Sequence, residues 1–134
     1  MNVEKIKPKS ELISMTENNF TRKDYLKELD FLKIKIFYGL KNLNDGFDVE
    51  TEYYFSEKEF EIILDRIEDY NIGIYGIEPF LNGEFYGVLT CEQYETEPND
   101  KTWYKKAFEI YKEQSKELQY SATYMIPNEL ITKK

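Results

Sequence analysis

The alternation of apolar and polar positions is clearest after Ser56, where it predicts an amphipathic helix. Ser56-Glu57-Lys58-Glu59 has the form of a capping box, which opens a helix by satisfying its first N–H groups. Apolar residues then follow at helical spacing, and Gly73 lies just past the predicted end. The inward positions are Phe60, Ile63, Leu64 and Ile67, and the opposite face carries Glu57, Glu61, Asp65, Glu68 and Asp69.

A second amphipathic helix is predicted after Pro98. Asn99 or Asp100 is its cap, and the helix runs to about Ser115. Its inward positions are Trp103, Ala107, Ile110 and Tyr111, while Lys101, Lys105, Lys112 and Lys116 lie near one side. We interpret these lysines as a solvated face that can pair with carboxylates elsewhere in the chain.

The dipeptide Asn82-Gly83 predicts a hairpin between the two helices. A two-residue loop here pairs Ile77 with Val88 and Tyr75 with Thr90. One face of the hairpin is then assigned to the core, with Ile72, Ile74, Phe80, Phe85, Leu89 and Cys91. The other face carries Tyr75, Ile77, Glu84, Tyr86, Val88, Thr90 and Glu92.

Alternation also predicts a strand over Phe47 to Phe55 and another over Leu118 to Ile126. The resulting order is strand, helix, strand, strand, helix, strand. This order predicts an α+β fold with a ferredoxin-like antiparallel sheet and two helices on one face.

The region from Thr21 to Asn44 admits two interpretations. We favour a short N-terminal helix from about Arg22 to Phe31 followed by an extra strand, because apolar residues alternate with Lys33 and Lys35. A continuous helix also fits the apolar spacing. Residues 1 to 20 are polar and are expected to be loosely ordered, which leaves 21–134 as a single α+β domain.

Acidic residues crowd into the middle of the chain. Between Asn44 and Asp100, sixteen carboxylates face only Lys58 and Arg66, which gives this segment a charge of −14 in a chain of net charge −8. Such a field repels nucleic acid and anionic lipid and attracts cationic partners. The 21 aromatic residues indicate that the acidic segment belongs to a folded body.

The composition argues against an enzyme. The chain has no histidine and one cysteine, Cys91, which excludes the usual triads and multi-cysteine zinc sites. Phosphate-binding glycine loops and nucleophile elbows are also missing. We therefore expect no catalytic residues, no metal and no cofactor. No run of 18 apolar residues occurs, so we expect a cytoplasmic protein without a membrane segment.

If both predicted helices cover one face of the sheet, the other face is open. By parity it carries Glu50, Glu52, Tyr54, Tyr75, Tyr86, Thr90 and Glu92. Tyrosine offers a large rigid contact area and carboxylates accept bidentate arginine bonds, so this face suits a basic protein. The alternative is that the N-terminal helix covers this face and that the tyrosines belong to the core.

In these features the chain resembles bacterial immunity proteins that neutralise toxic nucleases, including those paired with contact-dependent inhibition toxins. The resemblance is one of character: a small, acidic, tyrosine-rich, histidine-free domain. It implies a monomer that forms a one-to-one complex with its basic toxin and does not bind nucleic acid itself. The candidate partner-binding residues are Glu50, Glu52, Tyr54, Glu57, Glu61, Asp65, Glu68, Asp69, Tyr75, Tyr86 and Glu92. Either acidic face, helix or sheet, can serve.

A second hypothesis is a small-molecule-binding module similar to GyrI-like effector-binding domains. That resemblance implies a pocket for a hydrophobic cation, with Glu78 or Glu92 beside Tyr75 and Tyr86. The chain lacks the internal duplication usual in those domains. A third hypothesis, mimicry of DNA against a host enzyme, differs from the first in its target.

Overall fold

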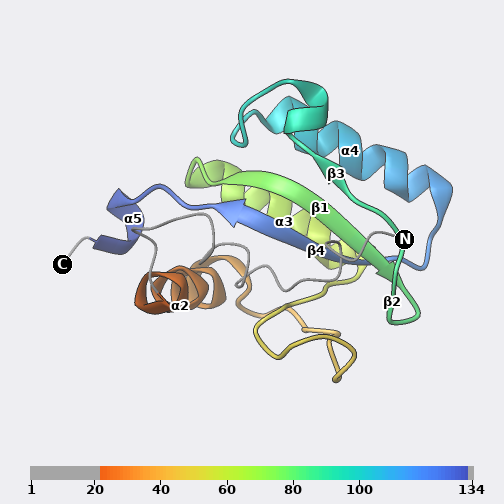
Figure 1. Ribbon diagram of the computed structural model, residues 1–134, viewed down its shortest axis with the longest axis horizontal. Coiled ribbons are helices and arrows are strands. Elements are labelled where there is room, and N and C mark those ends of the chain that lie inside the picture. Colours follow the sequence, from red (N-terminus) through yellow and green to blue (C-terminus); the bar gives the residue numbers. More distant parts are fainter. Residues whose placement is uncertain (1–21, 133–134) are drawn as a thin grey trace.

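The computed structural model describes residues 22–132 and confirms the mixed α+β class (Figure 1). The predicted loosely ordered segment, residues 1 to 20, lies outside the described residues. The elements in chain order are α2 (Arg22–Phe31), the π-helix η2 (Leu32–Ile36), α3 (Glu57–Asp69), β1 (Gly73–Leu81), β2 (Glu84–Phe85), β3 (Leu89–Thr90), the 3₁₀-helix η3 (Glu92–Tyr94), α4 (Lys101–Gln114), β4 (Gln119–Met125) and α5 (Glu129–Thr132).

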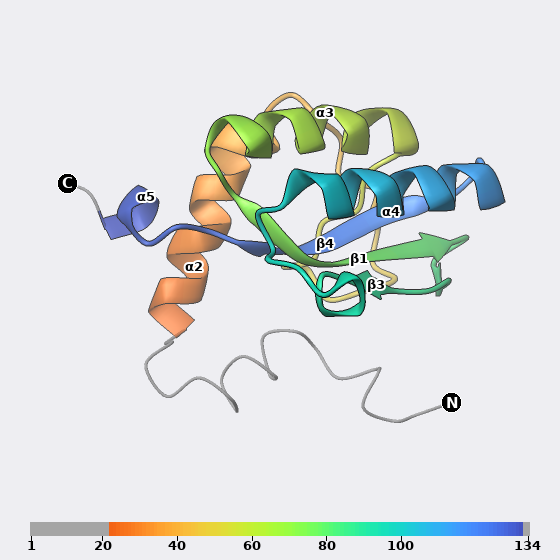
Figure 2. The same ribbon diagram turned by 90° about the horizontal axis from the view of Figure 1, so that it is seen from above.

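Strand β1 is the centre of an antiparallel sheet. It pairs with β4 along one edge and with β2 and then β3 along the other. Helices α3 and α4 lie together on one side of these strands (Figure 2). Phe60 of α3 and Phe108 of α4 both contact the ring of Tyr120 on β4, each with ring centroids 5.1 Å apart. These contacts join both helices to the sheet.

The sequence signals of the two long helices are confirmed. The Ser56 side chain accepts a hydrogen bond from the Glu59 N–H at 3.3 Å, and all four predicted inward residues of α3 are buried. The Glu59 carboxylate accepts instead from the Lys41 N–H at 2.9 Å, so it holds the preceding segment against α3. Asp100 caps α4 through the Thr102 N–H. The buried residues of α4 are Trp103, Tyr104, Ala107, Phe108 and Tyr111, whereas the predicted Ile110 is half-buried.

The predicted strand over Phe47 to Phe55 is wrong. Only Phe55 pairs with the sheet, through two backbone hydrogen bonds to Tyr120. The Asn44 side chain explains the difference, because it accepts from the N–H groups of Gly46 and Asp48 and donates to the carbonyls of Asp48, Val49 and Glu52. An Asx-centred network of this kind folds the segment into a loop. The ferredoxin-like arrangement, which needs a first strand here, is not confirmed.

The extra strand predicted after Phe31 is also wrong, whereas the helix Arg22–Phe31 is confirmed with its bounds. Residues Leu32–Ile36 continue it as a π-helix. Arg66 of α3 donates to the carbonyls of Ile36 at 2.7 Å and Tyr38 at 2.8 Å, so it satisfies carbonyls left unpaired where the helix ends. Its guanidinium also lies over the Tyr38 ring, 3.8 Å from the centroid.

Two irregularities overturn the predicted faces of the hairpin. Along β4, Ile74 pairs with Tyr124 but Gly76 pairs with Thr123. Tyr75 is therefore an extra residue of β1 relative to β4, which makes a β-bulge. Along the other edge, the register of β2 differs by one residue from that of β3, so residues 86–88 contain one more extra residue. Each bulge reverses the alternation of side chains beyond it. Ile77 is therefore buried with Ile72, Ile74 and Cys91, while the predicted core residues Phe80 and Leu89 are half-buried and Phe85 is exposed.

Gly73 is predicted to tolerate no side chain. A Cβ at this position would lie 2.5 Å from the carbonyl carbon of Pro98, a backbone atom that cannot rotate away. Gly73→Ala should therefore lower the free energy of unfolding by roughly 1–3 kcal/mol, as overpacking does, measured by urea denaturation. Gly76→Ala is the matched control, because its nearest contact would be 3.4 Å away. Equal losses in the two variants would contradict the prediction.

Candidate functional site

The acidic residues of the middle segment all reach the surface. None of the Asp and Glu residues between Asn44 and Asp100, a range that the structure describes throughout, is buried. Their negative field therefore acts on the solvent. A binding surface also needs exposed apolar area next to this charge.

The predicted acidic face of α3 is present but partly neutralised. Glu61, Asp65 and Asp69 are exposed, and Glu57 is half-buried. Glu68 accepts hydrogen bonds from Lys101 at 2.7 Å and Lys105 at 2.8 Å, which lower the pKa of its carboxyl to about 2. The lysines of α4 thus pair with one of these carboxylates, as their spacing suggested.

A further lysine of α4 adds positive charge beside this face. Lys112 is held by Glu109 at 2.9 Å, and that bond, with the nearby charges of Glu61 and Glu57, raises the pKa of the ammonium group. The positive charges of α4 therefore weaken the field of the neighbouring α3 surface.

The predicted tyrosine face of the sheet does not assemble. Tyr75 is 47% exposed on β1, but the Tyr86 ring turns toward α4, where it contacts Tyr111 and its hydroxyl donates to Gln114 at 2.9 Å. The extra residue at Tyr75 accounts for this reversal, because Tyr86 lies opposite Pro79, which follows that bulge in β1. Tyr54 is 1% exposed, and its hydroxyl donates to Asp48 at 2.5 Å. Burial raises the pKa of Tyr54, and the bond to Asp48 adds to the shift. The assignments of Tyr54 and Tyr86 to an open face were wrong.

The carboxylates predicted for the same face lie outside the strands of the sheet. Glu50 is exposed in the loop that follows Asn44, and Glu92 is exposed at the start of η3. Glu52 is half-buried and accepts a hydrogen bond from Ser121 of β4 at 3.3 Å. Strand alternation therefore does not place these three residues on one face with Tyr75.

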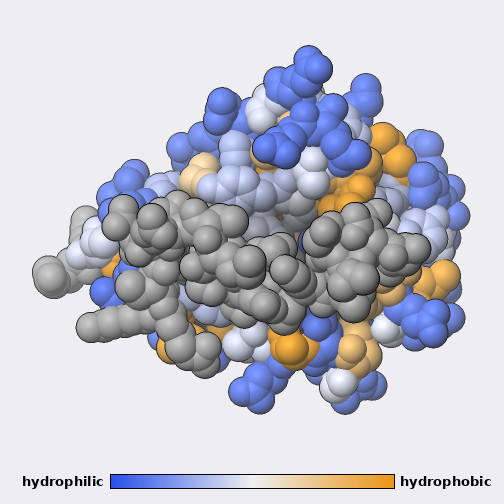
Figure 3. Space-filling model, viewed as in Figure 1, coloured by the Kyte–Doolittle hydropathy of each residue, from blue (hydrophilic) through white to orange (hydrophobic). Residues whose placement is uncertain are grey.

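An acidic and aromatic surface does form at the hairpin end of the molecule. The Phe80 ring contacts Phe47, Tyr54 and Phe85, with centroids 4.8–6.0 Å apart. We call this the hairpin-end surface: Phe47, Phe80 and Phe85 with Asp45, Asp48, Glu50 and Glu84. Phe85 is 43% exposed, and Asp45, Glu50 and Glu84 are also exposed. Figure 3 shows hydrophobic and hydrophilic side chains side by side at this end, where Figure 1 places β2.

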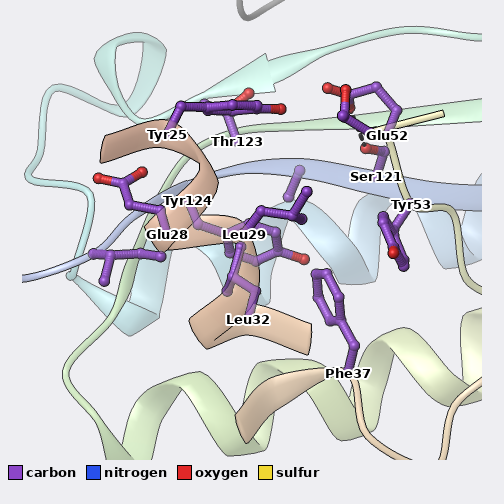
Figure 4. A pocket seen from close by; sticks show the side chains of 13 residues that line it. Tyr25, Glu28, Leu29, Leu32, Phe37, Glu52, Tyr53, Ser121, Thr123 and Tyr124 are labelled. Atoms are coloured by element: carbon purple, nitrogen blue, oxygen red, sulfur yellow. Dashed lines mark hydrogen bonds between the residues drawn. The ribbon is translucent and has the colours of Figure 1, made fainter. Parts of the chain in front are cut away.

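A small cavity lies between α2 and β4 (Figure 4). It holds about 70 Å³ and is lined by Tyr25, Glu28, Leu29, Leu32, Phe37, Thr51, Glu52, Tyr53, Ser121, Ala122, Thr123, Tyr124 and Ile126. Burial, and secondarily the charge of Asp24, raises the pKa of the Glu28 carboxyl to about 7. Burial also raises the pKa of the Tyr124 hydroxyl.

Sequence reasoning missed Glu28, although a signal for it was present. Tyr25, Glu28, Leu29 and Leu32 recur at helical spacing, so one helix face combines a carboxylate with apolar residues. The β4 side of the cavity could not be inferred, because nothing in the sequence pairs α2 with residues about a hundred positions later.

Comparison with known proteins finds no matching family model, no matching curated protein and no matching solved structure. Residues 22–132 contain no group of three or more His, Cys, Asp and Glu side chains that could hold a metal ion. None of the helices in the same range is long and apolar enough to cross a membrane.

The raised pKa of Glu28 predicts a specific pH dependence. Because the folded protein holds this proton up to about pH 7 and the ordinary value is 4.5, the contribution of Glu28 to stability falls as pH rises through that interval. Glu28→Gln, which stays neutral, should raise the free energy of unfolding by on the order of 1 kcal/mol at pH 8 and by less at pH 4. Urea denaturation at the two pH values measures both.

The control for this prediction is Glu61→Gln, which removes a carboxylate from the exposed face of α3. Its effect on unfolding should be small and similar at pH 4 and pH 8. A Glu28→Gln variant with the same gain at both pH values would refute the assignment.

Proposed function

We propose that this protein is an immunity protein that binds and neutralises a basic protein toxin, a nuclease, through the hairpin-end surface. The proposal rests on one observation: at the hairpin end of the molecule, an exposed aromatic side chain and exposed carboxylates belong to the same surface. Phe85 supplies the apolar contact, its chain neighbour Glu84 is exposed, and Glu50 is exposed in the loop that carries Phe47. Tight interfaces commonly have this composition, with aromatic anchors at the centre and a polar rim.

The hairpin-end surface is a better candidate than α3. The face of α3 adjoins the lysines of α4, two of which pair with Glu68. The aromatic side chain of α3 itself, Phe60, is buried, and the exposed Tyr38 ring beside this helix stacks on the positive charge of Arg66. Charge without apolar area speeds association but contributes less to the lifetime of a complex.

The proposed mechanism is steric and electrostatic. The charge of −14 between Asn44 and Asp100 attracts the basic surface with which a nuclease holds nucleic acid. Carboxylates then occupy positions that nucleic-acid phosphates would take, and the aromatic residues slow release. In this proposal the protein acts in the cytoplasm as a monomer that forms a 1:1 complex. It performs no catalysis and needs no cofactor.

The small-molecule hypothesis receives less support. The residues proposed for its pocket do not gather, because Tyr75 is exposed on β1 while Tyr86 packs toward α4. The cavity between α2 and β4 is about 70 Å³, whereas pockets for drug-sized ligands usually enclose about 300–1,000 Å³. A hydrophobic cation of that size would not fit inside it.

Co-expression tests the proposed function. The chain should co-purify with the product of the gene immediately upstream of its own and should restore growth to cells that produce that protein. The complex should weaken with added salt, because steering by exposed charge is screened. Absence of growth rescue, together with no retention of any basic protein at low salt, would refute the function.

Two double variants test the surface. Glu50→Lys with Glu84→Lys should slow association at least about tenfold at low salt, measured by stopped-flow or surface plasmon resonance. Glu61→Lys with Asp65→Lys is the matched control, because it reverses as many exposed charges on α3. Circular dichroism verifies that both variants fold. A larger effect from the α3 pair would move the binding site to that helix.

A further inference from the structure

The cavity between α2 and β4 combines aromatic walls with carboxylates. Rings from Tyr25, Phe37, Tyr53 and Tyr124 line it. Glu28 comes from α2, and Glu52 comes from the segment before Phe55, on the opposite side of the cavity (Figure 4). Aromatic faces attract cations, and carboxylates supply the counter-charge. Neither feature suits an anion.

Core packing alone does not explain Glu28. Its carboxyl is half-buried beside Leu29 and Leu32, where a carboxylate is costly and an apolar side chain would fill the space without that cost. Within residues 22–132, Glu28 forms no ion pair with a basic side chain. A cation placed beside this carboxyl would stabilise its charged form.

We propose that this cavity binds the head of an organic cation, an alkylammonium or guanidinium group, with Glu28 as its counter-ion and the rings of Phe37 and Tyr124 as its walls. The volume of about 70 Å³ has room for a group of a few non-hydrogen atoms, while the rest of the ligand extends out of the cavity. The head group belongs either to a free amine or to a lysine or arginine side chain of a protein partner. The proposal does not depend on the proposed function.

The titration of Glu28 provides the readout. The groups that face it are Asp24 on α2, Glu52 before Phe55, and the phenols of Tyr25, Tyr53 and Tyr124. In the free protein, burial and Asp24 raise the pKa of Glu28 to about 7. A bound cation favours the carboxylate form, so it must lower this pKa.

The probe is n-butylammonium chloride, which has the shape of a lysine side-chain end. Titrated into the full chain, it should give saturable NMR shifts of Tyr124 and Phe37 and lower the pKa of Glu28 by about one unit or more. Sodium chloride at equal ionic strength and n-butanol should do neither. Equal shifts with n-butanol would show an apolar cavity only and overturn the proposal.

A matched pair of variants on α2 completes the test. Glu28→Gln keeps the shape of the side chain and should weaken butylammonium binding at least about tenfold. Asp30→Asn removes a carboxylate from an exposed position of the same helix and should leave binding unchanged. Unchanged affinity in Glu28→Gln would overturn the proposal. If that variant fails to fold, the pKa measurement on the wild-type protein still decides.

The complex with the upstream gene product distinguishes the two sources of the cation. If Glu28→Gln weakens that complex about tenfold, and butylammonium competes with it, the head group belongs to the partner. If Glu28→Gln leaves the complex unaffected while the wild-type protein binds butylammonium, the cavity binds a free amine. If no complex forms, the proposed function fails, and the butylammonium titration still tests the cavity.

Discussion

The packing of Tyr120 is the contact on which the rest of the structure depends. Its ring contacts Phe60 of α3 and the α4 residues Phe108 and Tyr111. Its backbone forms the only bridge between Phe55 and the sheet that the described residues show. One side chain of β4 therefore contacts both helices, and the same residue anchors the end of the loop that begins at Asn44.

The helices were predicted correctly because their signals are local in the sequence. The faces of the sheet were predicted incorrectly because they depend on residues distant in the sequence. The cap at Ser56 and the spacing of apolar residues act within one or two turns, so α2, α3 and α4 could be read directly from the sequence. The extra residue at Tyr75 exists only relative to β4, about fifty residues away. The Asn44 network likewise competes with an alternating pattern that looks like a strand.

The same distinction between local and non-local signals applies to the candidate binding residues. The exposure of Glu61, Asp65 and Asp69 follows from the helical period, and it was predicted correctly. The placement of Tyr54 and Tyr86 needed the parity of strands, which one loop and one bulge changed. Glu28 belongs to a cavity that exists because α2 lies against β4, and the hairpin-end surface exists because Phe47 lies against Phe80. Both are products of tertiary packing.

The shortness of β2 and β3 limits how another molecule can engage the sheet. Each has two residues, and an interruption separates them, so this edge presents few backbone N–H and C=O groups in register. A partner cannot extend the sheet by adding a long strand of its own here, which is a common route both to peptide recognition and to aggregation. Recognition at this edge therefore falls to side chains, whose identity can change without altering the hydrogen bonds that hold β1 and β4 together.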